Sequence, residues 1–401
     1  MRNRGQFLAF CLFIAYSGAI EVMTARYAAP SLQYALTVSL VMLTGLVLGM
    51  VAAVRYGRMF ANALIAAHPY ILLLLWTILS VTWSIAPTTS LLSCLLLLLM
   101  VCAACGLVTL TSWRGLLTGI AYSAIFLGLL SLLLIPVGGL MTETHIGALK
   151  GPFPEKNHAG MIYAIGGVTA MALCFFDRHP AWLLAVGFQA ILLYLTKSGT
   201  ATLAFGLGIS TLCAIEVLRE RPRRLVFGIW IGTFALMLFG AWILNNSESI
   251  LAALGEDSTF TGRDKIWSAV WLRIQQVTWT GYGYGTFWRD PHTIIQWMWY
   301  EAGYEFFTAH NTWLDIWLSL GIPGVGLIIY SLIRPLVTGL AGLNFPDDAR
   351  RIAIPSLLMI LFMSLTETVM GNPDGPTFFF TIVLTVKTMM PQNHTFTYHR
   401  F

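Results

Sequence analysis

The sequence predicts an all-α integral membrane protein that crosses the bilayer about twelve times, as a single transmembrane domain over residues 1–401. Hydrophobic residues make up 57% of the 401 residues and charged residues only 10%, and the mean hydropathy is +0.74. Apolar runs of about 20 residues recur along the chain, which is the length that a helix needs to cross a hydrocarbon core of about 30 Å. Lipid offers the backbone no hydrogen-bond partners, so these runs must be helices. This composition excludes an ordinary soluble protein.

The apolar runs define the individual spans. In chain order, the expected spans are residues 5–23, 30–54, 61–83, 89–111, 115–140, 158–176, 180–197, 199–218, 224–244, 312–332, 352–370 and 375–391. The first run resembles a secretory signal, but no small-residue cleavage site follows it. We therefore interpret it as a retained span.

The distribution of basic residues predicts the orientation. With the N-terminus in the cytoplasm, the inside loops carry 15 Lys and Arg and the outside loops carry 8, which together make the 23 of the sequence. The dense cluster Arg219, Arg221, Arg223 and Arg224 then lies inside, as the positive-inside rule requires. Both termini are expected in the cytoplasm and the long polar loop in the periplasm of a bacterial inner membrane.

Cysteine usage and net charge exclude several other classes. All six cysteines lie in apolar segments, where they are expected to be packing residues and form neither disulfides nor a zinc site. The net charge of +5 follows the topology, so we expect no nucleic-acid partner. No metal-spaced cluster or phosphate-binding loop is present, and no cofactor is expected.

Functional residues are expected in the long polar stretch 245–311. Such a stretch does nothing to help the chain cross the bilayer, so its presence indicates another role. Thr261 followed by Asp264 is a variant of the helix capping box. Apolar and tryptophan residues at helical spacing then predict a helix over about 262–279, with one apolar face suited to the membrane surface. The run Gly281–Gly285 should end it.

Arg263 and His310 are the strongest candidates for chemistry. Arg263 falls near a helix N-terminus, where the dipole and unpaired N–H groups favour an anion and a guanidinium adds a fork matched to phosphate oxygens. Pairing of Arg263 with Asp264 or Glu256, or contact with lipid headgroups, is the alternative. His310 suits proton transfer or hydrogen bonding to a developing charge, although an interfacial histidine is more often structural. Asp315 could orient His310, cap its helix or pair with a cation.

Further polar residues occur at the ends of other outer spans. Lys156, Asn157 and His158 precede one span, and Lys197 lies in a tight turn between two others. Each lysine could hold phosphate as a point charge or simply extend to the membrane surface. Glu367 lies late in an apolar span, where a carboxylate needs a partner, and it could pair with one of the outer cations.

Several of these segments together resemble the bacterial O-antigen ligase and polysaccharide polymerase superfamily. The segments, which run from about residue 150 to 330, are Gly151–His158, Leu195–Ser198, Thr261–Trp267, Thr280–Phe287, Ala309–Asp315 and Leu320–Gly324. In one departure from the ligases, Ser198-Gly-Thr200 stands where they often read Ser-Arg-Gly, and Lys197 could substitute for the missing arginine. The Lys-Asn-His element and the glycine run are closer to the exopolysaccharide polymerase branch.

The resemblance implies an inner-membrane glycosyltransferase of the GT-C-like type that works without a metal or nucleotide sugar. Its implied partners are an undecaprenyl-pyrophosphate-linked oligosaccharide, a glycan acceptor, membrane lipid and a polysaccharide chain-length regulator. The expected site residues are Arg263 and His310 as catalytic groups, Arg263, Lys197, Lys156 and Arg289 as pyrophosphate ligands, and Asn157, His158, Asn311, Asp315 and Glu367 as supporting groups.

A polymerase is the expected function, and three alternatives stay open. A lipid A core sugar as acceptor would make the same chemistry an O-antigen ligase. A transporter of lipid-linked sugars is a second alternative, although transporters tend to show symmetric halves and polar residues near the membrane midplane. A scaffold for an envelope assembly complex, with the loop as its docking surface, is the third.

Overall fold

The computed structural model describes residues 2–20, 30–142, 145–218, 228, 263–289, 293–343, 349–372 and 375–391. Its helices, in chain order, are α1 (Arg2–Tyr16), α3 (Pro30–Ala66), α4 (His68–Ser80), η1 (Val81–Trp83), α5 (Pro87–Leu110), α6 (Trp113–Leu134), η2 (Ile135–Val137), α7 (Lys156–Asp177), α8 (Trp182–Thr196), α9 (Gly199–Leu218), α12 (Arg263–Gln276), α13 (Thr293–Ala302), α14 (Thr312–Gly342), η3 (Ala349–Ile352), α15 (Ala353–Met363) and α16 (Pro376–Met389). The only β pairing among the described residues is an isolated bridge between Leu140 and Leu149.

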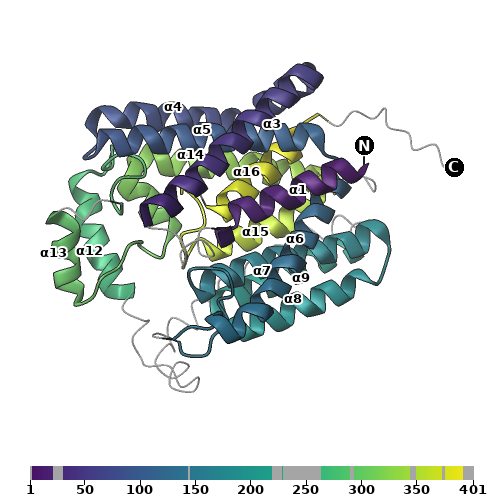
Figure 1. Cartoon of the computed structure of the whole chain (residues 1–401). Helices are drawn as coiled ribbons and strands as arrows, with labels where there is room; N and C mark the ends of the chain where they lie inside the picture. The colour runs from purple at the N-terminus through teal and green to yellow at the C-terminus, as the bar shows by residue number, and fades with distance from the viewer. Residues whose placement is uncertain are drawn as a thin grey trace.

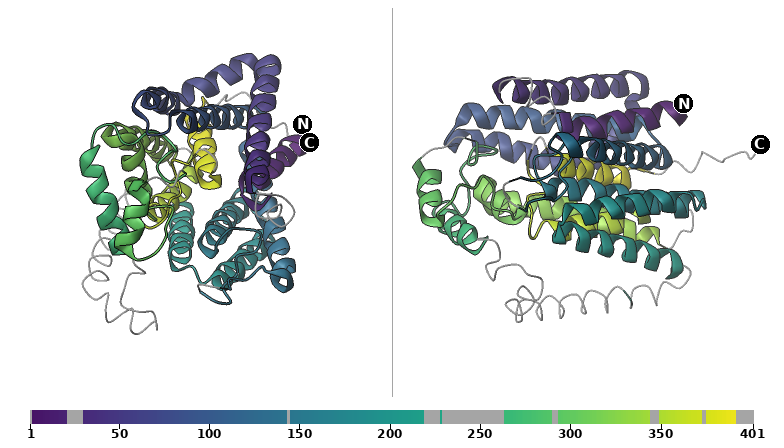
Figure 2. Two further views of the ribbon diagram at one scale, coloured as in Figure 1. Left: turned by 60° about the vertical axis from the view of Figure 1, so that its left-hand side comes forward. Right: turned by 60° about the horizontal axis from the view of Figure 1, so that its bottom comes forward.

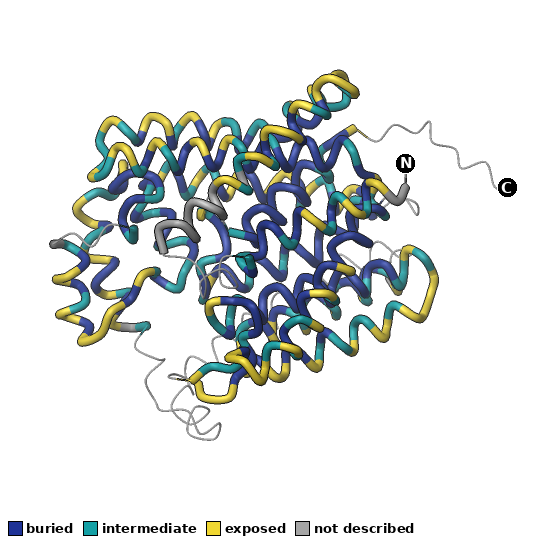
Figure 3. Tube along the Cα trace, in the orientation of Figure 1, coloured by how far each residue is buried: buried dark blue, intermediate teal, exposed yellow. Residues whose placement is uncertain are grey.

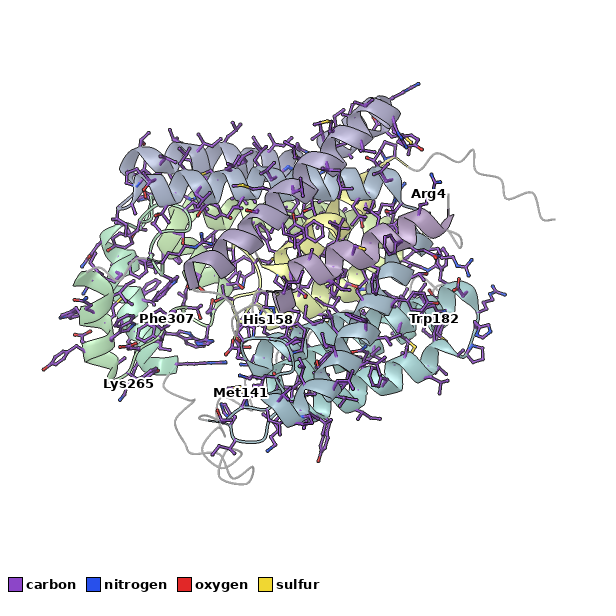
Figure 4. The ribbon with its side chains drawn as sticks, viewed as in Figure 1. Arg4, Met141, His158, Trp182, Lys265 and Phe307 are labelled. Carbon is purple, nitrogen blue, oxygen red and sulfur yellow. The ribbon has the colours of Figure 1, made fainter. Side chains whose placement is uncertain are left out.

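The long helices lie side by side in one bundle, and α12 and α13 sit together at one end of it (Figures 1 and 2). The N-terminal helix begins at the other end, so that Arg4 and Lys265 mark opposite ends of the molecule (Figure 4). We refer below to the end that carries Lys265 as the α12 end.

The predicted all-α, polytopic membrane class is confirmed. Six of the described helices are long and apolar enough to cross a membrane. They cover residues 42–66, 87–110, 113–137, 156–177, 199–217 and 312–342. Shorter apolar helices cover 4–16, 68–83, 182–196 and 376–389. The expected span 224–244 lies outside the described residues, apart from residue 228.

Two predicted boundaries are wrong. The predicted break between the spans 30–54 and 61–83 coincides with a kink at Tyr56, but α3 continues beyond it to Ala66 and the next helix, α4, begins at His68 and not at 61. The predicted span 352–370 is helical only over α15, and turns follow from Ser364 onward. The reason for the second departure is that Glu367 and its neighbours leave the helix to bind polar partners on other elements.

Small residues allow the helices to approach closely. A Cβ atom on Gly45 of α3 or on Gly106 of α5 would collide with the backbone of Leu99 or Leu48 on the facing helix, the kind of contact that drives helix association in lipid. Buried residues fill the middle of the bundle, and exposed ones line its outer helices (Figure 3). Many of those exposed residues are apolar, as expected for a surface in contact with lipid.

Helices α12 and α13 form a second apolar cluster. Ile266, Val270 and Ile274 of α12 pack with Ile295 and Met298 of α13. The helix α12 falls within the predicted 262–279, and its buried apolar face is turned toward these protein contacts. Its Thr261 cap lies outside the described residues. Trp271, at 44% exposure, remains on the surface.

The glycine run after α12 docks against a kink in α14. The backbone N–H groups of Tyr282 and Gly283 donate to the carbonyls of Leu318 and Ser319, at 2.9 and 3.0 Å. Gly281 and Gly321 both have positive φ, +67° and +66°, and a Cβ on either would collide with the backbone of the other segment. Glycine is therefore required at both positions, and the contact fixes the start of α14, where the candidate residues lie.

Candidate active site

Glu367 is the centre of the candidate site. It lies in the turn segment after α15 and is 3% exposed, and a carboxylate so buried is stable only with close partners. Its Oε1 accepts hydrogen bonds from Arg263 Nη2 at 2.8 Å and Asn157 Nδ2 at 2.9 Å. Its Oε2 lies 3.4 Å from His310 Nδ1. The sequence suggestion that Glu367 pairs with an outer cation is therefore confirmed.

Arg263 reaches this centre from the first residue of α12. Its side chain is 15% exposed and forms an ion pair with Glu367, 104 positions away in the sequence, and not with a sequence neighbour among the described side chains. A guanidinium has five N–H donors. The bond to Glu367 uses one of them, which leaves donors for an anionic ligand.

Asn157 and Ser198 join α7 and α9 to the same centre. Asn157 donates to Glu367, and its Oδ1 accepts from Ser198 Oγ at 2.9 Å. Asn157 is thus held by both sides of its amide, which fixes its orientation. The predicted supporting role of Asn157 remains a proposal, but its side chain is a direct partner of Glu367.

The two candidate lysines are placed differently from one another. Lys156 is buried, and its Nζ donates to the carbonyl of Lys197 at 3.2 Å. Lys197 closes α8 in a left-handed conformation, φ +53°, and its own Nζ points to the carbonyl of Ile146 at 3.3 Å. Among the described contacts none joins the Lys197 ammonium to Glu367, Arg263 or His310, and its predicted role in place of an arginine stays a prediction.

His310 occupies the loop before α14 in a left-handed conformation, φ +47°. Such a backbone is uncommon outside glycine, and its strain is frequently found at functional sites. The hydrogen bond to Glu367 is the largest influence on the imidazole and raises the pKa of His310 above its ordinary 6.5, although burial opposes the shift. The charged imidazolium form is therefore favoured.

Asn311 and Asp315 hold the His310 loop in place. Asn311 caps α14, because its Oδ1 accepts from the N–H groups of Trp313 and Leu314 at 3.0 and 3.2 Å. Asp315 accepts from the N–H of Ala309 at 3.0 Å and from the indole of Trp288 at 2.8 Å. Of the roles considered for Asp315, the structure shows contact with the backbone next to His310 and not with the imidazole itself.

Glu155 is a member of the site that the sequence reasoning did not select. Burial is the main reason that its pKa is raised, and the nearby Glu367 carboxylate adds to this, while His310, Arg263 and Lys156 lower it. Its position in the sequence, directly before Lys156 and Asn157, could have indicated that it belongs to the site. The site thus holds two carboxylates as well as its cations.

Two other candidates lie apart from Glu367. His158, visible in Figure 4, stacks on Phe153 with ring centroids 5.6 Å apart, and its ring lies near Gly18 after α1. Arg289 lines a separate cavity of about 230 Å³ together with Asp315. No contact described for Arg289 joins it to Glu367, although the cavity that it lines also reaches Thr368, the residue after Glu367.

Three helix N-termini converge at this centre. Lys156 and Asn157 begin α7, Arg263 begins α12, and His310 directly precedes the Asn311 cap of α14. Each N-terminus adds a partial positive charge and unpaired N–H groups. The centre is therefore a positively polarised, mostly buried polar site at the α12 end of an otherwise apolar bundle.

The fold and this site define a polytopic α-helical membrane protein with a buried ionic centre at one end. Residues 184–329 match the family model described as O-antigen ligase. The match includes Arg263 and His310, whereas Asn157 and Glu367 lie outside it.

The chain is also similar to a curated relative, the exopolysaccharide production protein ExoQ of Rhizobium meliloti (strain 1021). The two are 29% identical over 290 residues, which cover 66% of this chain and 62% of the relative. Together the two comparisons confirm the resemblance that the sequence motifs indicated, including the exopolysaccharide branch.

Proposed function

We propose that the chain is a glycosyltransferase that polymerises glycan repeat units carried on undecaprenyl pyrophosphate, at the periplasmic face of the bacterial inner membrane. The observation that carries this proposal is the convergence of Arg263, His310 and three helix N-termini on Glu367. The similarity to an exopolysaccharide production protein favours polysaccharide extension over transfer to lipid A.

The chemistry requires stabilisation of a leaving group. As the acceptor hydroxyl attacks the sugar carbon, the bond to pyrophosphate breaks and negative charge gathers on the phosphate oxygens, and the hydroxyl proton passes to the departing diphosphate or to solvent. Preorganised donors at those oxygens lower the barrier directly. The Arg263 guanidinium supplies a planar fork for two oxygens, and the helix N-termini supply further positive potential.

His310 acts beside Arg263 as a second donor. Since Glu367 favours the imidazolium, His310 donates a hydrogen bond to the pyrophosphate and is poorly suited to accept the proton of the acceptor. Lys156 adds a third cation near Glu155 and Glu367. Arg263, Lys156 and the His310 imidazolium outnumber the carboxylates of Glu155 and Glu367, and the helix N-termini add further positive potential, so the net positive charge fits a diphosphate without a metal.

The O-antigen ligase reaction is the second candidate, because the matched family model bears that description. Donor and leaving group are the same in both reactions, and only the acceptor differs. The Glu367 centre therefore serves either one equally.

The glycan products of a deletion strain separate these functions. We expect accumulation of single lipid-linked repeats, which indicates a polymerase, and restoration of polymer by the intact gene. Free polymer that is not attached to lipid A would indicate a ligase instead. A lipid-linked intermediate trapped on the cytoplasmic side would indicate transport, and it would overturn the proposal.

A further inference from the structure

The cavity lined by Arg289 and Asp315 adjoins the Glu367 centre, because its lining includes Thr368, the residue after Glu367. Its volume is about 230 Å³, and its lining includes Trp288, Arg289, Phe307, Asp315, Thr368 and Asn372. Phe307 and Asn372 are exposed, whereas Asp315 is buried. The cavity therefore runs from an exposed rim to a buried floor, where Asp315 lies beside apolar side chains such as Ile316 and Leu320. Phe307 marks its position at the α12 end in Figure 4.

Adjacent residues of one segment serve the two sites. Glu367 binds Arg263 and His310, while the next residue, Thr368, donates to Asp315 Oδ2 and lines the cavity. The loop before α14 repeats this arrangement, since Thr308 lines the cavity and His310 contacts Glu367. The segment after α15 and the loop before α14 are therefore shared by the cavity and the centre.

The lining fits a sugar better than the other parts of the substrate. Sugar hydroxyls both donate and accept hydrogen bonds, and the carboxylate, amide and hydroxyl groups of Asp315, Asn372 and Thr368 offer both roles. The rings of Trp288 and Phe307 supply apolar surface for the C–H faces of a pyranose. Arg289 and Asp315 line the cavity with opposite charges, so the lining does not offer a diphosphate the net positive charge of the Glu367 centre, and the polar groups of Arg289 and Asn372 favour a polar ligand over a polyprenyl tail.

The size of the cavity limits the ligand to about one ring. A single water requires about 10–15 Å³ of cavity space, so about 230 Å³ holds a ligand much larger than water. The volume falls below the range of about 300–1,000 Å³ that is typical of drug-sized ligands. A single sugar ring is larger than water and smaller than a drug-sized ligand, so it fits a cavity of this size. A longer glycan would extend past Phe307 at the rim.

We propose that this cavity is a glycosyl subsite that binds one sugar ring beside the diphosphate-binding centre. The inference deepens the proposed function and rests on it for the identity of the neighbouring centre. The ring belongs either to the acceptor glycan or to the donor glycan, and Phe307 and Asn372 at the rim are the residues that select it.

Direct binding of a sugar tests the subsite without any turnover. Full-length protein in lipid nanodiscs is titrated with methyl glycosides of glucose, galactose and mannose, and binding is followed by saturation-transfer NMR. For at least one glycoside we expect saturable binding that weakens roughly tenfold in Phe307→Ala and in Asn372→Ala. The matched control is Tyr300→Ala, an aromatic residue of α13 at 87% exposure, which should bind as the wild type does.

The outcomes separate this inference from the proposed function. Equal binding in all variants, or no saturable binding of any glycoside, would overturn the subsite. If the rim variants lose binding while Arg263→Ala keeps full elongation, the subsite stands and the assigned diphosphate centre fails. In an elongation assay with a soluble acceptor glycoside, a raised KM for that acceptor in Phe307→Ala assigns the ring to the acceptor. A raised KM for the lipid-linked donor assigns it to the donor.

Discussion

Arg263 Nη2 lies 2.8 Å from Glu367 Oε1, and this pair joins the start of α12 to the segment that follows α15. Both side chains are largely withdrawn from water, with 15% and 4% of their surface exposed. The pair therefore positions the arginine for a ligand and also connects distant parts of the chain.

Loss of Glu367 should destabilise the fold. In Glu367→Gln the Arg263 charge loses its carboxylate, and removal of one partner of a buried pair costs about 3–5 kcal/mol. We expect the lower end of this range, because Arg263 keeps some exposure. Thermal unfolding in detergent measures the effect. In the double variant Arg263→Gln/Glu367→Gln, the decrease in the free energy of unfolding should be smaller than the sum of the decreases in the two single variants. Additive decreases would show that the pair is not coupled.

Donor binding should weaken as the pH rises above the ordinary pKa of His310. Because the pKa of His310 is raised in the folded protein, the imidazolium persists above pH 6.5. As the pH rises past this folded-state pKa, the imidazolium loses its proton, and the stabilisation from its pair with Glu367 is lost. Glu367, Glu155 and Arg263 are the charged groups that face it. The KM for lipid-linked donor should therefore rise on the alkaline side of neutrality.

The matched variant His310→Gln keeps a hydrogen-bond donor but cannot titrate. Its donor KM should be higher than that of the wild type near neutrality, and the alkaline rise should be absent. An unchanged rise in this variant would assign the titration to another group, of which Glu155 is the nearest alternative.

Gly321 should tolerate alanine far less well than Gly303. Both glycines have positive φ, which costs an L-residue about 1–2 kcal/mol. A Cβ at Gly303 meets nothing within 4 Å, whereas at Gly321 it collides with the backbone of Trp279, and overpacking adds about 1–3 kcal/mol. The melting temperatures of Gly321→Ala and Gly303→Ala compare the two. Equal decreases would contradict the docking of the glycine run on α14.

The sequence predicted the helical class because hydropathy and the lack of backbone partners in lipid leave no other choice. It also selected Arg263, His310, Asn157 and Glu367 separately, as polar residues whose presence the apolar surroundings did not explain. It could not predict that all four meet, because their contacts join segments more than 40 positions apart.

Local signals failed where tertiary contacts decide the structure. The apolar run 352–370 gave no indication that the chain leaves the helix after Met363, since this depends on partners for Glu367 and Thr368 elsewhere. Lys197 was selected for its charge and its place in a tight turn, and Arg289 for its charge, and the directions of both side chains depend on neighbours that the sequence does not reveal.

The most direct measurement is elongation of lipid-linked repeat units by reconstituted Arg263→Ala protein. Removal of one donor to a developing charge costs about 10²–10³ in kcat, so we expect a loss of that size. The control Lys265→Ala removes an exposed cation two residues along the same helix and should elongate normally. Wild-type elongation by a folded Arg263→Ala protein would contradict the assignment of the leaving-group site to Arg263.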